Sequence, residues 1–381
     1  MPRIEYHANA LLLPSTGGTA RGAPGAKQPA TFDGGAYDAF GRLLPLGIHA
    51  GIGARNIAAP MAGEGPAASL PGTWLFGGWL RHHFGHFVHE CLGRLWAWPE
   101  LAERPDGILF LPHGWLRGQH PPRRATGDGD QRFLPALLPL LGIEAPVRVL
   151  LQPTRVERLV LPQQLLLLPC AEDPEAPRRH QDFLARMGEA AAGAGPPAGR
   201  AYLSRARLAP PAASFVLESV IEENLARAGY AILHPETMPL PAQIAAYRGL
   251  TDLIFAEGSA LHLAAPFLGP RSRVAALWRE GRRLGVMHKQ VLVAGVQAVT
   301  ECDAMLGWVA PDPVNWRKAH GLPDFVRLGA TLEADGFVPP GSWRVPGRAE
   351  IEAAIAERIA LLEAAEPGCG ARFLPVQRPT A

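Results

Sequence analysis

In this chain of 381 residues, a strand–turn–helix pattern is found in the stretch Asp252-Leu253-Ile254-Phe255-Ala256-Glu257-Gly258-Ser259-Ala260-Leu261-His262. A short apolar run passes through a polar turn into helix-favouring residues, which predicts a strand over 252–256 and a helix over 259–267. Free backbone N–H groups at such a turn favour an anion, and ligands of open α/β sheets gather at the carboxyl ends of the strands. We therefore predict a phosphate-binding turn, with Glu257 able to hold ribose hydroxyls. The alternative is an ordinary strand-to-helix turn with an exposed Glu257 and Ser259 as the helix cap.

The same alternation extends in both directions from this stretch. Strands are predicted over 201–204 and 230–233, and helices over 214–228 and 240–250, which is typical of a parallel doubly wound sheet. Arg205 and Arg207 directly follow the first of these strands, at the same edge of the predicted sheet. Two guanidinium groups there could clamp a diphosphate, because the planar fork of arginine matches phosphate oxygens. Solvated surface arginines are the alternative.

A second informative segment is His82-His83-Phe84-Gly85-His86-Phe87-Val88-His89-Glu90-Cys91-Leu92-Gly93-Arg94-Leu95. If it is helical from residue 85 onward, one face carries a polar stripe and the other is apolar. The stripe consists of His86, His89, Glu90, Gly93 and Arg94. Three interpretations are open: a metal site, an acid/base site and a structural histidine cluster. The order of residues does not fit the His-Glu-x-x-His zinc motif, whereas a histidine beside a carboxylate suits proton transfer from a hydroxyl.

Length and composition favour a two-lobed globular protein. We expect an α/β lobe over residues 1–171, with a loop-rich lead-in over 14–36, and a second lobe over 172–381 that ends in a helix over 348–366. Hydrophobic residues make up 48% of the chain and the net charge is +2. This balance gives no reason to expect a nucleic-acid partner, and no apolar run is long enough to cross a membrane.

The cysteines and the N-terminus carry further expectations. Four scattered cysteines without a Cys-x-x-Cys pair argue against a disulfide framework and a thiolate zinc site. The N-terminus lacks the layout of a signal peptide, so we expect a cytoplasmic protein. Arginine far outnumbers lysine, which suggests GC-rich codon usage and a bacterial source.

Several motifs in this order resemble glycosyltransferase family 61, across residues 72–280. The family carries an Asn-aromatic-aromatic-His-Trp-x-x-Asp/Glu segment ending in Leu-x-Arg-Leu, a Tyr-Ile-Ser-Arg-like element, a Leu-x-x-Gln-Ile element and a pattern near His-Gly-Ala-x-Leu-Thr-Asn. The matching segments here are His83 to Leu95, Tyr202-Leu203-Ser204-Arg205, Leu240-Pro241-Ala242-Gln243-Ile244 and Glu257-Gly258-Ser259-Ala260-Leu261-His262. The chain departs from the family at three positions, with His83 in place of Asn, Glu257 in place of His and His262 in place of Thr.

The resemblance implies a GT-B fold of two facing Rossmann-like lobes with parallel sheets, and inverting transfer from a nucleotide-activated sugar without a required metal or other cofactor. A UDP-sugar is the expected donor, and the acceptor would be a glycan or glycolipid in capsule or exopolysaccharide synthesis, with peripheral membrane contact left open. The residues assigned to catalysis are His86 and Glu90; those assigned to the acceptor are His83, His89 and Arg94; those assigned to the donor are Arg205, Arg207, Glu257, Gly258, Ser259 and His262. The sequence does not choose between His86 and Glu90 as the base. A non-catalytic sugar- or nucleotide-binding protein and a metal-dependent hydrolase are the two alternatives.

Overall fold

The computed structural model describes residues 2–19, 30–51, 54–63, 65–81, 83–112, 133–166 and 173–376. The chain forms two compact units, Met1–Ala190 and Ala191–Ala381. The division expected between residues 171 and 172 falls outside the described residues. The observed division leaves helices α3 (Ala176–Ala185) and α4 (Met187–Ala190) in the first unit.

The main sheet of the first unit has six strands in the order β4-β1-β9-β6-β7-β8. Their bounds are β1 Ile4–Leu13, β4 Gly35–Tyr37, β6 Ala68–Leu80, β7 Gly107–Pro112, β8 Val147–Val149 and β9 Thr154–Pro162. The β9-β6-β7-β8 half is parallel, whereas β1 pairs antiparallel with both β4 and β9. The expected parallel sheet is therefore only partly realised in this unit.

Short elements complete the first unit. A small sheet contains β2 Gly18–Thr19, β3 Ala30–Phe32 and β5 Ala54–Asn56. Besides α3 and α4, the described residues of this unit contain η1 Pro45–Gly47, α1 Phe84–His86, η2 Phe87–Cys91, η3 Leu95–Glu100, α2 Leu134–Leu137 and η5 Pro139–Leu141. A cluster of buried side chains from the sheet, including Trp74, Phe76, Trp79 and Leu109, forms the core of this unit.

The main sheet of the second unit has five strands in the order β11-β10-β12-β13-β14, all parallel. Their bounds are β10 Arg200–Leu203, β11 Ala231–Leu233, β12 Asp252–Ala256, β13 Arg273–Leu277 and β14 Val299–Cys302. In chain order this is 2-1-3-4-5, so the order of strands reverses between β10 and β12. Ligands of doubly wound sheets bind at the carboxyl ends of the strands at this reversal.

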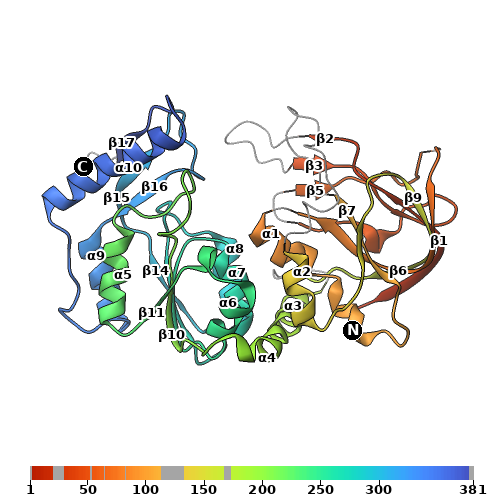
Figure 1. Ribbon diagram of the computed structural model, residues 1–381, viewed down its shortest axis with the longest axis horizontal. Helices are drawn as coiled ribbons and strands as arrows, with labels where there is room; N and C mark the ends of the chain where they lie inside the picture. The colour runs from red at the N-terminus through yellow and green to blue at the C-terminus, as the bar shows by residue number, and fades with distance from the viewer. Residues whose placement is uncertain are drawn as a thin grey trace. The chain divides into compact units, whose positions relative to one another are not determined.

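Helices cover both faces of this sheet, as a doubly wound fold requires (Figure 1). One face packs against α5 Glu218–Arg227 and α9 Phe325–Ala334, and the other against α6 Leu240–Tyr247, α7 Ala260–Ala264 and α8 Gly285–Val293. Helix α10 Arg348–Ala365 lies against a separate small sheet. The shorter helices are η6 Ala192–Ala194, η7 Pro235–Thr237 and η8 Ala265–Phe267. A separate sheet in the order β16-β15-β17 contains β15 Met305–Ala310, β16 His320–Pro323 and β17 Arg372–Pro375.

Local sequence explains these elements. Alternate residues of β12 and β13, such as Ile254 and Ala275, belong to the core beneath α5 and α9, while Phe255 packs edge to face on Trp278. The strands are buried on both faces, as the near-continuous apolar runs of a parallel sheet predict. Asp324 caps α9 by accepting a hydrogen bond from the Arg327 N–H.

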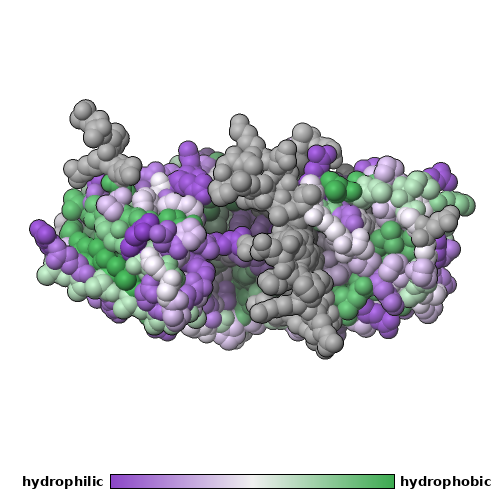
Figure 2. All heavy atoms as spheres, turned by 90° about the horizontal axis from the view of Figure 1, so that it is seen from above, coloured by the Kyte–Doolittle hydropathy of each residue, from purple (hydrophilic) through white to green (hydrophobic). Residues whose placement is uncertain are grey.

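On the face shown in Figure 2, the described residues of both units mix hydrophilic and hydrophobic side chains. Within the described ranges, no helix has the length and apolar character needed to cross a bilayer.

Candidate functional site

The histidine segment follows β6 and folds as two short helices. One turn of α-helix, α1, continues into a π-helical turn, η2, instead of the regular α-helix expected from residue 85 onward. π-Helical turns are rare and are often found at functional sites. The wider turn still places His86 and Glu90 within reach of each other, one turn apart.

Glu90 lies at the centre of a buried polar cluster. Its carboxylate contacts His86 Nδ1 at 2.7 Å through Oε1, and through Oε2 it contacts His49 Nε2 at 3.0 Å and Arg81 Nη1 at 3.4 Å. The side chain of Glu90 is 0% exposed. Burial alone raises the pKa of Glu90, but hydrogen bonds from His49 and His86 and the charge of Arg81 bring that pKa well below its ordinary value. Glu90 is therefore a stable carboxylate and a weak base.

His86 is the member of this cluster that faces solvent. Its side chain is 26% exposed. Because an ionised carboxylate only accepts hydrogen bonds, the proton between His86 and Glu90 belongs to Nδ1 of the imidazole, and in the neutral ring Nε2 is then the acceptor. A carboxylate that orients a histidine in this way is the arrangement used for general-base catalysis. The structure thus separates the two predicted catalytic residues into a candidate base, His86, and a positioning group, Glu90.

His49 was not predicted, because it lies 41 positions before Glu90 in the chain. Burial lowers the pKa of His49, so it donates to Glu90 as a neutral imidazole. Gly51 lies directly against this pair, since a Cβ there would be 2.7 Å from His49 Nε2 and 2.8 Å from Glu90 Oε2. Gln164 connects the loop around Ala50 to the histidine segment. Its Oε1 accepts from the N–H of Ala50, and its Nε2 donates to the carbonyl groups of Ala50 and Glu90. In the sequence, the one hint of this contact was the histidine and glycine at positions 49 and 51, which precede β6.

The three residues assigned to the acceptor lie in different environments. His83 is exposed, and its ring lies 5.3 Å from that of His86, edge to face. His89 is buried. Arg94 is also buried, where it donates to the carbonyl groups of Pro162 and Ile48 and lies over Phe76, and burial lowers its pKa to about 9. Of the three, only His83 shares the exposed face of His86.

In the second unit, the carboxyl ends of β10, β12 and β13 bring the predicted donor residues together. Leu203 pairs with Phe255, and Ala256 pairs with Leu277, so the residues that leave the three strands continue side by side. Arg205 donates through Nε and Nη2 to the carbonyl oxygen of Ala213, at 3.0 and 2.8 Å. Its Nη1 lies over Gly258, where a Cβ would collide with it. A side chain at position 258 would therefore force the guanidinium group of Arg205 to move from its place over the turn.

A buried carboxylate, Glu218, holds this strand end in place. It accepts hydrogen bonds from the hydroxyl groups of Tyr202 and Ser204 and from the backbone N–H groups of Arg205 and Phe215. Burial raises the pKa of Glu218, and these four donors oppose that effect. Residues 214–217, expected to be helical, form this loop instead, and α5 begins at Glu218.

The other predicted donor residues differ in exposure. Glu257 is only 4% exposed, so the alternative of an exposed glutamate is wrong. Ser259 makes no side-chain capping bond, and α7 is only five residues long. His262 is buried and contacts Gln290 Oε1 through Nδ1 at 2.6 Å. Arg207 is exposed, and its backbone N–H donates to Glu236.

Arg279, which was not predicted, follows β13 at the same edge. Its Nη1 donates to the carbonyl groups of Trp316 and Ala319, and its Nη2 lies 3.3 Å from Glu280 Oε1 and 4.0 Å from Glu257 Oε1. Burial raises the pKa of Glu257, and the charge of Arg279 opposes the shift. Arg279 could have been found from the sequence as an arginine two residues beyond a short apolar strand. That inference needs β13 to be recognised as a strand first.

The model of the glycosyltransferase 61 family matches residues 84–275, just over half of the chain. The chain belongs to glycosyltransferase family 61. No curated protein sequence matches it. As a member of this family the protein is a mixed α/β glycosyltransferase, whose substrates are a nucleotide-sugar donor and an acceptor.

The family match covers only part of the two residue groups. It includes His86, Glu90, Arg205 and the turn at Glu257, whereas His49 and Arg279 lie outside it. In this family 61 protein, the surroundings of the matched residues are thus completed by residues from the flanking segments.

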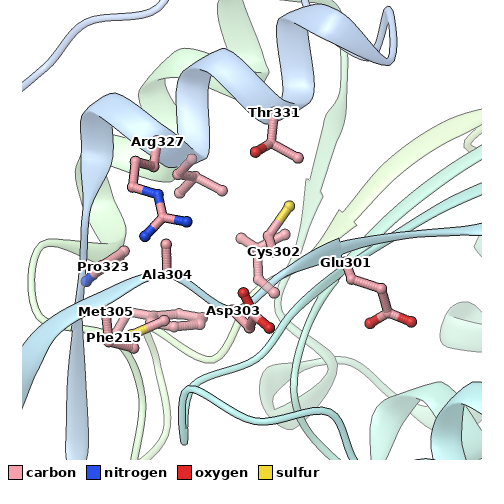
Figure 3. A pocket seen from close by; sticks show the side chains of 11 residues that line it. Phe215, Glu301, Cys302, Asp303, Ala304, Met305, Pro323, Arg327 and Thr331 are labelled. Atoms are coloured by element: carbon pink, nitrogen blue, oxygen red, sulfur yellow. The ribbon is translucent and has the colours of Figure 1, made fainter. Parts of the chain in front are cut away.

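One cavity of about 90 Å³ lies at the carboxyl end of β14 (Figure 3). It is bounded by Cys302 and Asp303 on one side and by Arg327 and Thr331 of α9 on the other. None of the predicted site residues lines it. Among the described residues, no group of three or more His, Cys, Asp or Glu side chains is placed to hold a metal ion.

Proposed function

We propose that this family 61 protein is an inverting glycosyltransferase that moves a sugar from a nucleotide-diphosphate donor to a hydroxyl group of a glycan or glycolipid. The observation that supports this proposal most is the His86–Glu90 pair. It combines a buried, ionised carboxylate with a partly exposed imidazole whose outer nitrogen is an acceptor. Inverting transfer requires one such base.

In the proposed reaction, His86 Nε2 takes the proton of the acceptor hydroxyl group. The hydroxyl oxygen forms a bond to the anomeric carbon, while the bond from that carbon to the diphosphate oxygen breaks on the opposite face. The electron pair of the broken bond leaves with the nucleotide diphosphate. Glu90 keeps Nδ1 protonated and stabilises the imidazolium that forms, as a carboxylate does behind a catalytic histidine.

We assign the donor to the strand ends of the second unit. Arg205 at the reversal point of the sheet meets the negative charge that develops on the diphosphate, with Gly258 and Ser259 lining the turn that it crosses. Glu257 is the candidate for the ribose hydroxyl groups, while Arg207 is placed for contact with the exposed end of the donor. His262 supports the turn through Gln290.

The proposal also covers the fold type, the donor nucleotide, the biological role and the location of the protein. The resemblance in sequence supports a GT-B protein, in which each unit forms one lobe, acting without a metal on a UDP-sugar. A role in bacterial capsule or exopolysaccharide synthesis, and a place in the cytoplasm at the inner face of the membrane, complete the proposal.

The test is to incubate the purified protein with a panel of nucleotide sugars and candidate acceptors, and to measure sugar transfer and free nucleotide. In His86→Asn, the amide can still donate to Glu90 but the outer acceptor nitrogen is lost. We expect transfer to fall by about 10²- to 10⁴-fold with the melting temperature nearly unchanged.

The matched control is His7→Asn, because His7 forms a histidine–glutamate pair with Glu5 at 3.1 Å. This variant should keep full activity. If His86→Asn retains wild-type transfer, His86 is not the base. Nucleotide-sugar binding without transfer or hydrolysis by the wild type would establish the non-catalytic alternative, and zinc found by elemental analysis together with metal-dependent hydrolysis would establish the hydrolase.

A further inference from the structure

We propose that Arg279 and His320 complete a pyrophosphate-binding site with Arg205, in which Arg279 Nε and His320 Nε2 each donate to a phosphate oxygen. The inference rests on the proposed function only for the identity of the natural ligand, the donor diphosphate. Both residues lie outside the segment that matches the family.

His320, at the start of β16, is 1% exposed and its protonation pattern is determined by its neighbours. The backbone N–H of Ser214 donates to His320 Nδ1 at 3.1 Å, and Arg358 Nη1 lies 3.4 Å from the same nitrogen. Since both neighbours can only donate, Nδ1 is an acceptor and Nε2 carries the proton of the neutral ring. Nε2 is buried and has no hydrogen-bond partner in the described part of the chain.

Arg279 presents a second donor of the same kind. Its two terminal nitrogens are bonded to carbonyl groups and to Glu280, whereas Nε is buried and finds no acceptor among the described residues. A buried donor left without a partner is destabilising by about 1–3 kcal/mol, so native proteins rarely retain one without a reason. An acceptor from outside the chain would satisfy both donors at once.

Short links connect these donors to Arg205. Arg205 donates to the carbonyl oxygen of Ala213, and the next residue, Ser214, holds the ring of His320. Arg279 donates to the carbonyl oxygen of Ala319, the residue before His320. Burial and the charges of Arg358, Arg279 and Arg205 lower the pKa of His320 to about 3, so its ring is neutral near pH 7.

The chemistry of the cluster selects the ligand. The unused groups of Arg205, Arg279 and His320 are N–H donors, and guanidinium groups favour oxyanions. The carboxylate of Glu257 lies 4.0 Å from Arg279 Nη2 and offsets part of the positive charge. Arg205 Nη1, which bonds to no described residue, adds a third donor. A pyrophosphate group offers several acceptor oxygens and negative charge, which match this set.

The test is calorimetric titration with inorganic pyrophosphate, which requires neither the sugar nor the base of the donor. In His320→Asn, the amide oxygen can still accept from Ser214, while the donor at Nε2 is lost. We expect pyrophosphate affinity to fall about 10-fold or more, as for the loss of a hydrogen bond to a charged group. A melting curve without ligand checks that this variant is folded, because asparagine leaves part of the space of the buried ring empty and brings a buried NH2 group of its own.

Arg327→Gln on the exposed surface of α9 is the control and should bind like the wild type. Wild-type affinity in His320→Asn, or no pyrophosphate binding by the wild type, overturns the inference. If nucleotide sugars are still transferred in that case, the proposed function stands alone. If pyrophosphate binding depends on His320 but no sugar is transferred, the binding site stands and the proposed function fails.

Discussion

Two buried glutamates, Glu90 in the first unit and Glu257 in the second, have pKa values shifted in opposite directions. Their exposed fractions are almost the same, 2% and 4%. His49, His86 and Arg81, among the described residues, contact the carboxylate of Glu90 within 3.4 Å, whereas Glu257 accepts from the Glu280 N–H at 3.1 Å and lies 4.0 Å from Arg279. The comparison teaches that the number and closeness of donors, more than burial, decide the direction in which the pKa of a buried carboxylate shifts.

The largest effect on stability is expected from Glu90→Gln. Because the pKa of Glu90 is depressed in the folded state, its stabilising contribution is present above its ordinary value of 4.5 and is lost as the pH falls through the folded pKa. We expect a loss of about 3–5 kcal/mol at pH 7, as when one partner of a buried ion pair is removed. Urea denaturation across a pH series measures it.

Below pH 4.5 the difference between Glu90→Gln and the wild type should shrink. Glu5→Gln, which alters the partly exposed pair with His7, is the control. A loss that is equal at pH 7 and in acid would mean that Glu90 acts by packing and not by charge.

The next effect concerns the space around Glu90. A methyl group in Gly51→Ala would meet both His49 Nε2 and Glu90 Oε2, so the pair must shift and the orientation of His86 with it. We expect sugar transfer to fall about 10-fold, since small displacements of catalytic groups are costly. Gly63→Ala is the matched control, because no atom lies within 4 Å of a Cβ there. Equal activity in both variants would show that the cluster tolerates displacement.

A smaller effect of opposite sign is expected for Glu257→Gln. A raised pKa means that the charged form is disfavoured in the fold, so wild-type stability decreases as the pH rises from below 4.5 through the folded pKa. Glutamine lacks this dependence. At pH 7 the variant should melt at the same temperature as the wild type, or up to about 4 °C higher. A large loss at pH 7 would place Glu257 in the same class as Glu90.

The smallest effect is expected at a pair outside both clusters. Arg348 and Glu352 form an exposed ion pair one helical turn apart in α10, at 2.7 Å. Such pairs add little stability because water screens them. Arg348→Ala should melt like the wild type in thermal denaturation. A clearly lower melting temperature for Arg348→Ala would show that an exposed ion pair can stabilise this fold as buried pairs do.

The second unit was largely predictable from sequence, because its strands and helices are local patterns. The strand over 252–256 coincides with β12, and the helix over 259–267 corresponds to α7 and η8. Strand β13 was not predicted, since its run of small residues is short and begins with Arg273. Without β13, Arg279 had no structural context.

The first unit was harder to predict because its contacts join distant segments. The sequence indicated that His86 and Glu90 lie together, since that pair is four residues apart. It did not indicate the pairing of β1 with β9, nor the contact of His49 with Glu90, which connect residues far apart in the chain. It also did not indicate the π-helical turn, because the spacing of apolar residues is compatible with an α-helix.

The limits of the family match cut through both main sheets. Residue 84 lies just after β6, the strand between β9 and β7, and residue 275 lies inside β13. A recombinant fragment trimmed to residues 84–275 would lose the middle of one sheet and two strands of the other, leaving unpaired edges that promote aggregation. The limits of the family match are therefore a poor guide for designing expression fragments of this protein.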